Sequence, residues 1–121
     1  MTFNEYSVVV DETAKYPFSL GILYATLGLT GEAGEVSEKI KKIYRDKNGE
    51  INDEDKIGLM KELGDVLWYV AAICRELEVK MDDVALLNMA KLRTRVKTNT
   101  IHGNGDNREI RDTLQMGAKD I

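Results

Sequence analysis

The sequence predicts an all-α fold with a four-helix, bundle-like architecture. Apolar residues recur at helical spacing in four segments of the 121-residue chain. No segment shows the sustained alternation and β-branched enrichment that are typical of a strand. The one proline, Pro17, separates the first two helical patterns. Amphipathic helices bury their apolar stripes by packing on one another, which favours a bundle.

The composition suits one compact domain and argues against nucleic acid and anionic membranes as partners. Hydrophobic residues make up 43% and charged residues 31% of the chain, and its formal net charge is −4. This charge provides no general attraction to nucleic acid or to an anionic membrane, so we expect neither as a partner. The apolar runs are too short to span a bilayer, and the N-terminus has no basic region followed by an apolar stretch. A single cysteine, Cys74, excludes an internal disulfide and suits a reducing compartment, which favours a cytoplasmic protein.

The first two helices are expected over residues 3–15 and from Ser19 to about Tyr44. In the first, the residues at helical spacing are Tyr6, Val9, Val10 and Thr13. In the second, the apolar stripe consists of Leu29, Ala33, Val36, Ile40 and Ile43. Residues 46–50 break this rhythm, and their Asn-Gly step tolerates positive φ, which predicts a turn.

The third helix is expected to begin after a cap at Asn52 or Asp53 and to run to about Glu78. Its predicted apolar stripe consists of Met60, Leu63, Leu67, Val70, Cys74 and Leu77. The fourth helix is expected to begin at Asp82 or Asp83. Its predicted core side consists of Ala85, Met89, Leu92 and Val96, and its adjacent polar edge of Asn88, Lys91 and Arg95. After Thr98 the chain is polar and glycine-rich, which predicts a loop.

Two acidic pairs lie beside the stripes of the second and third helices. Glu32 and Glu35 form the first pair, and Glu62 and Asp65 form the second. Residues three apart are neighbours on one helix face, so packed helices would bring four carboxylates together. Their mutual repulsion calls for neutralisation by protons or by a hard divalent cation. Glycines lie next to these acids, and they indicate either close helix packing or room for a metal or ligand.

These motifs resemble those of the MazG-like nucleotide pyrophosphohydrolases, which belong to the all-α NTP pyrophosphatases. The resemblance rests on Leu-Thr-Gly-Glu-Ala-Gly-Glu (residues 29–35), Lys-Glu-Leu-Gly-Asp-Val-Leu-Trp-Tyr (61–69), Asn-Met-Ala-Lys-Leu-Arg-Thr-Arg (88–95) and Gly-Asp-Asn-Arg (105–108). An E-x-x-E pair followed by E-x-x-D is the hallmark of that superfamily. The resemblance implies a MazG-like domain over residues 1–108, and it leaves residues 109–121 as a C-terminal tail of unknown role.

The resemblance implies hydrolysis of a nucleoside or deoxynucleoside triphosphate between the α and β phosphates, with release of monophosphate and pyrophosphate. It implies an Mg²⁺ cofactor, with Mn²⁺ as a substitute, since Mg²⁺ prefers oxygen ligands. It also implies a dimer or tetramer of identical chains and a role in removing unwanted nucleotides. By motif position, the metal ligands are Glu32, Glu35, Glu62 and Asp65.

The remaining candidate residues are expected to have catalytic or substrate-binding roles. Glu35 or Glu38 would orient or deprotonate the attacking water. Lys91 and Arg95 would bind triphosphate oxygens, with Asn88 as a hydrogen-bond donor on the same edge. Contacts with the nucleotide are also expected from three further residues: Tyr69 to base or sugar, Trp68 to the nucleotide or a subunit interface, and Arg108 to phosphate. Trp68 points away from the predicted stripe and would be exposed in an isolated monomer.

Three alternatives remain open from the sequence. The first is a phosphoribosyl-ATP pyrophosphohydrolase-like enzyme, with the same fold, metal and cleaved bond but another substrate. The second is a carboxylate-bridged di-iron bundle, which usually takes ligands from Glu-x-x-His pairs; the chain has one histidine, His102, and no such pair. The third is a non-catalytic helical interaction module, because acids three apart are common on solvated helix faces.

Overall fold

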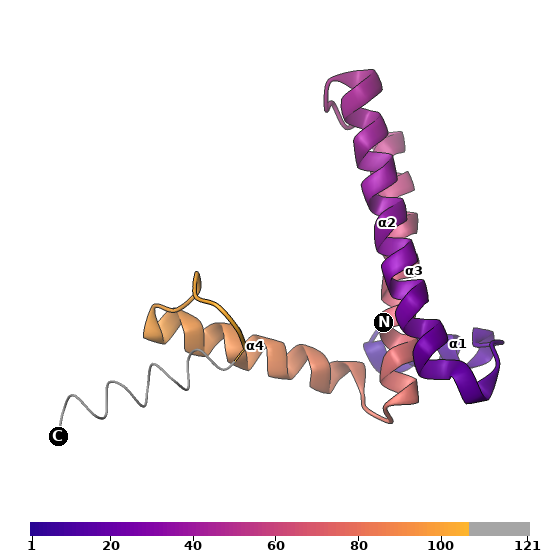
Figure 1. Ribbon diagram of the computed structural model, residues 1–121, viewed down its shortest axis with the longest axis vertical. Helices are drawn as coiled ribbons and strands as arrows, with labels where there is room; N and C mark the ends of the chain where they lie inside the picture. The colour runs from indigo at the N-terminus through magenta and orange to yellow at the C-terminus, as the bar shows by residue number, and fades with distance from the viewer. Residues whose placement is uncertain (107–121) are drawn as a thin grey trace. The chain divides into compact units, whose positions relative to one another are not determined.

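The computed structural model describes residues 1–106, and these residues contain helices and no strand. The helices are α1 (Phe3–Thr13), a single 3-10 turn η1 (Phe18–Leu20), α2 (Gly21–Lys47), α3 (Asp53–Glu76) and α4 (Met81–Thr98) (Figure 1). The all-helical prediction is confirmed. The chain divides into one compact unit over Met1–Met81 and a second that begins at Asp82, so the closure of four helices into one bundle stays a prediction.

Local side-chain chemistry explains where α1 and α3 begin. The Thr2 hydroxyl accepts a hydrogen bond from the Glu5 amide, while the Glu5 carboxylate accepts one from the Thr2 amide. Asn52 and Asp55 form the same reciprocal pair at the start of α3. Such pairs satisfy amide groups that have no partner within the helix. The predicted cap at Asn52 is confirmed.

Residues with left-handed backbone end α2 and α3. Asn48 has a φ of 54° and Gly49 a φ of 81°, which confirms the predicted turn, although α2 extends to Lys47 and not to Tyr44. Glu78 has a φ of 57°, and the Val79 amide donates to the Cys74 carbonyl, closing the end of α3. The third helix therefore ends at Glu76, and the fourth begins at Met81, each within two residues of the prediction.

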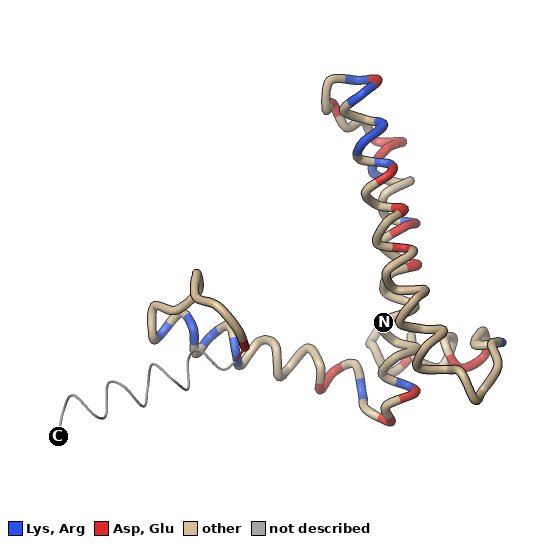
Figure 2. The backbone as a smooth tube through the Cα atoms, in the orientation of Figure 1, with Lys and Arg blue, Asp and Glu red and all other residues tan. Residues whose placement is uncertain are grey.

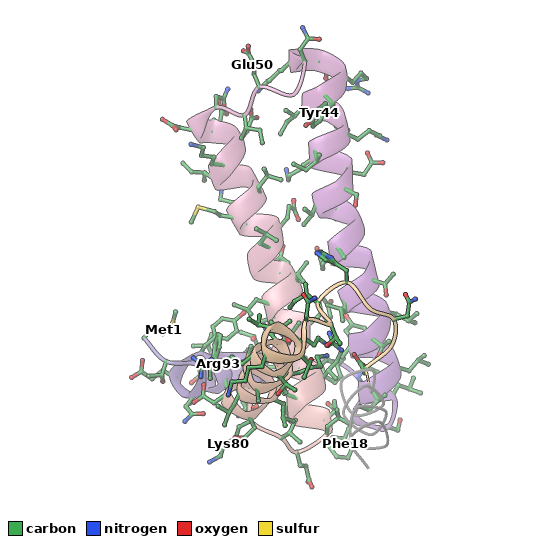
Figure 3. The ribbon with its side chains drawn as sticks, turned by 90° about the vertical axis from the view of Figure 1, so that its left-hand side faces the viewer. Met1, Phe18, Tyr44, Glu50, Lys80 and Arg93 are labelled. Carbon is green, nitrogen blue, oxygen red and sulfur yellow. The ribbon has the colours of Figure 1, made fainter. Side chains whose placement is uncertain are left out.

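The α2 and α3 helices form a long antiparallel hairpin, and α1 packs against α3 (Figure 1). Phe18 lies at one end of this hairpin and Glu50 at the other (Figure 3). The core lies at the end near α1 and consists of Val10, Ala25, Ala71, Ala72, Cys74 and Met81. Its alanines allow close approach of the helices, and the position of Cys74 in the core agrees with its apolar spacing. None of the helices among the described residues has the length and apolar character needed to cross a membrane.

The predicted apolar stripe of α3 is wrong in part. On α3, Met60, Leu63 and Leu77 are 68%, 54% and 59% exposed. The side of α3 that faces α2 instead carries half-buried Asp55, Leu59, Glu62, Val66 and Tyr69. Apolar spacing identifies a face that can be covered, but it does not specify which neighbour covers it.

The second helix matches its predicted stripe more closely than the fourth. On α2, Ile43 is buried, its neighbours on the stripe are half-buried, and Ala33 alone of the five is exposed. On α4, the whole predicted core side is exposed, namely Ala85, Met89, Leu92 and Val96. The apolar spacing of α4 therefore describes an amphipathic face and does not predict burial within the described chain.

The environment of Trp68 also differs from the prediction. Its side chain is half-buried against the core, and its indole Nε1 donates a hydrogen bond of 2.8 Å to the Thr13 hydroxyl on α1. Its ring also makes edge contacts with Tyr16 and Tyr69. The prediction of an exposed Trp68 is wrong because α1 folds back onto this side of α3, a long-range contact that the spacing within α3 does not reveal.

Candidate metal centre and its surroundings

Three carboxylates converge midway along the α2–α3 hairpin. Glu32 of α2 and Glu62 and Asp65 of α3 each offer one carboxylate oxygen, and these three oxygens lie within 4.8 Å of one another. The antiparallel pairing places the middle of α2 beside the middle of α3, and the three-residue spacing puts Glu62 and Asp65 on one face. We call these three residues the acidic cluster. Figure 2 shows the charged positions of the hairpin concentrated in its middle and in the half nearer the α2–α3 connection.

The electrostatics of the acidic cluster favour a cation. Burial raises the pKa of Glu32, and the neighbouring carboxylates of Asp65, Glu62 and Glu35 raise it further. Each neighbour therefore disfavours the charged form of Glu32 in the protein alone. Hard divalent cations such as Mg²⁺ take carboxylate oxygens as ligands, so this donor set fits one.

Glu35 and Glu38 lie outside the convergence. Both are exposed on α2, and neither belongs to the set of oxygens that come together. Glu35 is still close enough to contribute to the raised pKa of Glu32. The Glu38 carboxylate instead accepts a 2.9 Å hydrogen bond from Lys41, which lowers the pKa of Glu38. The structure thus gathers three of the four predicted metal ligands.

The glycines around the acidic cluster divide into two kinds. A side chain at Gly28 would collide with the ring of Tyr69, so this glycine allows close packing of α2 on α3. A side chain at Gly31, Gly34 or Gly64 would meet no atom within 4 Å. Of the two explanations that the sequence offers, close packing applies at Gly28, and open space beside the acids applies at the other three.

Tyr69 packs inside the hairpin one turn after Asp65. Its ring contacts Trp68 in an edge arrangement at 4.9 Å between centroids, and it contacts Tyr24 at 6.4 Å. Burial is the main cause of its raised pKa, followed by interactions with Tyr24 and with the acids Glu32 and Asp65. Tyr69 is therefore a packed residue that borders the acidic cluster.

Lys39 is a neighbour of the acidic cluster that sequence reasoning missed. Its ammonium lies 3.4 Å from Glu62 Oε1, across the gap between α2 and α3. The signal that could have identified it is its position seven residues after Glu32, two turns along the same face of the helix. Lys39 offsets part of the negative charge at Glu62.

In the second unit, the predicted phosphate-binding residues come together around Asp106. Lys91 Nζ lies 3.1 Å and Arg95 Nη2 3.4 Å from Asp106 Oδ1, and the Arg95 side chain is only 8% exposed. The hydrogen bond from Lys91 is the main cause of the lowered pKa of Asp106. Asn88 is exposed on the same helix. Asp106 was not predicted, and Arg108 and the tail over 109–121 lie outside the described residues.

The repulsion at Glu32 leads to a prediction for the metal-free protein. Because the pKa of Glu32 is raised on folding, its contribution to stability is present below its unfolded pKa and is lost as the pH rises through its folded pKa. We expect Glu32→Gln to raise the free energy of unfolding at pH 7 by about 0.5–1 kcal/mol, the scale of a relieved surface repulsion. Thermal unfolding with a chelator, from pH 7 towards pH 4, measures this.

The gain from Glu32→Gln should shrink as the pH falls, because the wild-type carboxyl then becomes protonated. Glu50→Gln, which neutralises an exposed acid in the connection between α2 and α3, serves as the control and should show no such gain. A Glu32→Gln protein less stable than wild type at pH 7, or a gain that does not depend on pH, would contradict the interpretation.

Comparison with known proteins adds three findings. A family model described as the MazG nucleotide pyrophosphohydrolase domain matches residues 22–100, a range that holds the acidic cluster and the polar edge of α4. The chain is 44% identical over 114 residues to the "Gene 37 protein" of Mycobacterium phage L5, an alignment that covers 89% of this chain and 100% of the phage protein. No solved structure matches the chain.

Proposed function

The chain belongs to the MazG nucleotide pyrophosphohydrolase family, and from this premise we propose that it hydrolyses a nucleoside or deoxynucleoside triphosphate between the α and β phosphates, in the presence of Mg²⁺. The products are a nucleoside monophosphate and pyrophosphate. The observation that carries the proposal is the convergence of Glu32, Glu62 and Asp65 within 4.8 Å. Such a cluster suits a divalent cation shared with phosphate oxygens.

The proposed chemistry assigns a role to each acid. Glu32, Glu62 and Asp65 hold the cation, and Glu35, on the adjacent edge of α2, completes the ligand set. When bound there, Mg²⁺, or Mn²⁺ in its place, would supply neutralisation of the charge that develops on the phosphate oxygens. Glu35 or Glu38 orients a water molecule and accepts its proton as the water oxygen bonds to phosphorus. The phosphorus attacked is that of the α phosphate; its bond to the α–β bridging oxygen breaks, and that oxygen leaves as part of pyrophosphate.

The proposed substrate contacts come from the polar edge of α4 and from the aromatic residues of α3. Lys91 and Arg95 bind phosphate oxygens, with Asn88 as a further donor, because cationic side chains form the strongest hydrogen bonds to phosphate. The pairing of both cations with the Asp106 carboxylate supports this role, since both already bind one anionic group. Tyr69 contacts base or sugar, and Trp68 contacts the nucleotide or a subunit interface, each through the part of its ring that packing leaves exposed. Arg108, which lies outside the described residues, contacts phosphate.

We further propose a homo-oligomer, either a dimer or a tetramer. Exposed apolar residues of α3 include Met60 and Leu63, and the open space at Gly64 lies next to them. A second copy of the chain would cover this face. Sedimentation of the purified protein tests the proposal: a monomer at micromolar concentration contradicts it, and Met60→Lys should weaken a genuine assembly.

The proposed setting is the cytoplasm, and the proposed role is removal of unwanted nucleotides from the pool. The catalytic domain is proposed to extend over residues 1–108, beyond the 22–100 that the family model matches, with residues 109–121 as a tail. A phosphoribosyl-ATP substrate is the alternative within the same fold and chemistry.

The testing experiment is hydrolysis of a panel of NTPs, dNTPs and phosphoribosyl-ATP with Mg²⁺, with chromatography that separates monophosphate from diphosphate. We expect monophosphate and pyrophosphate in equal amounts, and no turnover with a chelator. Turnover of phosphoribosyl-ATP alone would select the alternative substrate. Diphosphate and phosphate as products would contradict the proposed bond. No turnover and no Mn²⁺ binding would favour an interaction module.

A further inference from the structure

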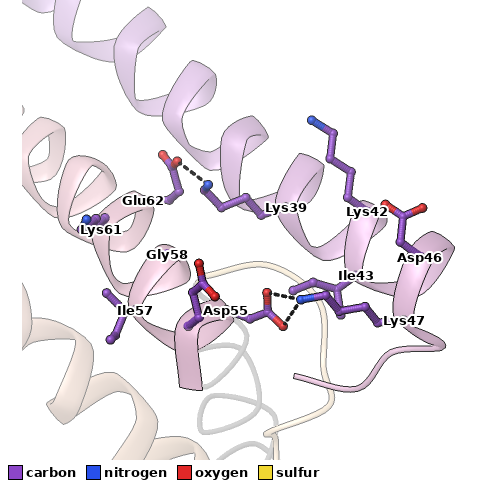
Figure 4. Close-up of a pocket in the computed structure, with 11 residues that line it drawn as sticks. Lys39, Lys42, Ile43, Asp46, Lys47, Asp55, Ile57, Gly58, Lys61 and Glu62 are labelled. Atoms are coloured by element: carbon purple, nitrogen blue, oxygen red, sulfur yellow. Dashed lines mark hydrogen bonds and ion pairs between the residues drawn. The ribbon is translucent and has the colours of Figure 1, made fainter. Parts of the chain in front are cut away.

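A cavity of about 520 Å³ lies between α2 and α3 on the connection side of the acidic cluster (Figure 4). Glu62 lines this cavity and also belongs to the cluster, so the two adjoin at this residue. Four lysines contribute to the lining: Lys39, Lys42, Lys47 and Lys61. The volume falls in the range of small-molecule sites, which is about 300–1,000 Å³.

Most acids of the cavity lining already have cationic partners. Lys47 Nζ donates to both carboxylate oxygens of Asp55, at 2.9 and 3.0 Å. Arg45 binds Asp46 through two hydrogen bonds of 2.7 and 2.8 Å. These ion pairs offset the negative charge of the lining, so the cavity can accept an anion.

Lys39 lies at the boundary between the cavity and the acidic cluster. Figure 4 shows its side chain reaching from α2 towards Glu62 on α3, and the ammonium lies 3.4 Å from Glu62 Oε1. A Cβ built on Gly58 would lie 3.9 Å from this ammonium, so the absence of a side chain at Gly58 leaves space beside it. The Lys39 side chain is 43% exposed, which leaves it free to change partner.

We propose that Lys39 and this cavity form the subsite for the pyrophosphate end of the nucleotide, an inference that rests on the proposed function. A divalent cation held by the acidic cluster would have Glu62 as a ligand and so would compete with Lys39 for this carboxylate. The Lys39 ammonium, which lines the cavity, would then be available to an anion there. A lysine is a compact point charge that suits phosphate oxygens. Lys39 therefore exchanges a carboxylate partner for the phosphate oxygens of the leaving group.

This exchange of partners predicts that Lys39→Met has opposite effects on the affinities for Mn²⁺ and for pyrophosphate. In Lys39→Met, Mn²⁺ alone should bind about two- to fivefold more tightly, because an exposed competing ion pair is lost. Inorganic pyrophosphate, titrated in the presence of Mg²⁺, should bind about ten- to a hundredfold more weakly, because a charge-assisted hydrogen bond is lost. Electron paramagnetic resonance measures the first and calorimetry the second. A residue with only a structural role would weaken both.

Two further variants serve as controls for this test. Lys56→Met removes an exposed lysine of α3 that pairs with Asp53, outside the cavity lining, and should change neither affinity. Lys39→Arg keeps the charge and should retain pyrophosphate binding within a few-fold. Wild-type Mn²⁺ binding with unchanged pyrophosphate affinity in Lys39→Met would overturn this inference and leave the proposed function intact. Absence of wild-type Mn²⁺ binding together with absence of hydrolysis would overturn both.

Discussion

Glu62→Gln is expected to abolish measurable nucleotide hydrolysis, with a loss of at least about a hundredfold. Glu62 belongs to the acidic cluster and lines the lysine-bearing cavity, and glutamine keeps its shape while removing its charge. Stabilisation by a bound cation amounts to several kcal/mol, and each 1.36 kcal/mol is about tenfold in rate. Initial rates with saturating Mg²⁺ and the best substrate of the panel measure the loss.

The matched control for this prediction is Glu50→Gln, which removes an exposed acid in the α2–α3 connection. Its rate should stay within about twofold of wild type. Mn²⁺ binding should be lost in Glu62→Gln and kept in the control. A Glu62→Gln enzyme that retains wild-type turnover would show that the acidic cluster is not the catalytic site.

Gly28→Val is expected to lower the free energy of unfolding by about 2–3 kcal/mol. The new side chain would meet the Tyr69 ring, and that ring cannot move freely because Tyr24 and Trp68 contact it. Overpacking of this kind costs about 1–3 kcal/mol, which outweighs the few tenths gained in helix propensity. Chemical denaturation in the presence of a chelator measures the change.

Gly34→Val provides the matched comparison, because a side chain at Gly34 meets no atom within 4 Å. We expect a change within about 0.5 kcal/mol, and any gain to come from helix propensity. Equal destabilisation by the two substitutions would show that the cost comes from the helical backbone and not from contact with Tyr69.

Local features of the fold could be predicted from the sequence. The Asn52 cap and the turn at Asn48 and Gly49 depend on a few adjacent residues, so their chemistry can be recognised directly. The division of α3 into buried and exposed faces could not be predicted, because Met60 and Leu63 are as apolar as the residues that α2 and α1 cover. The environment of Trp68 depends on the docking of α1, which involves a partner 55 residues away.

In the candidate site, too, the sequence predicted what depends on one helix and missed what depends on how two helices pack. The spacing places Glu62 and Asp65 on one face, and the antiparallel hairpin adds Glu32. Glu35 does not join them because convergence depends on how α2 is rotated about its axis relative to α3, and spacing within α2 does not specify that rotation. Lys39 was missed for a related reason, since its partner Glu62 lies on the other helix.

The α2–α3 hairpin also has consequences for the order in which the chain folds. Its three converging acids come from two helices joined by a short connection between Lys47 and Asp53. Closing so short a loop costs little entropy, and pairings between neighbouring helices form quickly. During synthesis, the acidic cluster can therefore assemble once α3 has left the ribosome, before α4 has emerged. A cation present at that stage would relieve the repulsion between the acids and so accelerate hairpin formation, which stopped-flow refolding with and without Mg²⁺ would detect.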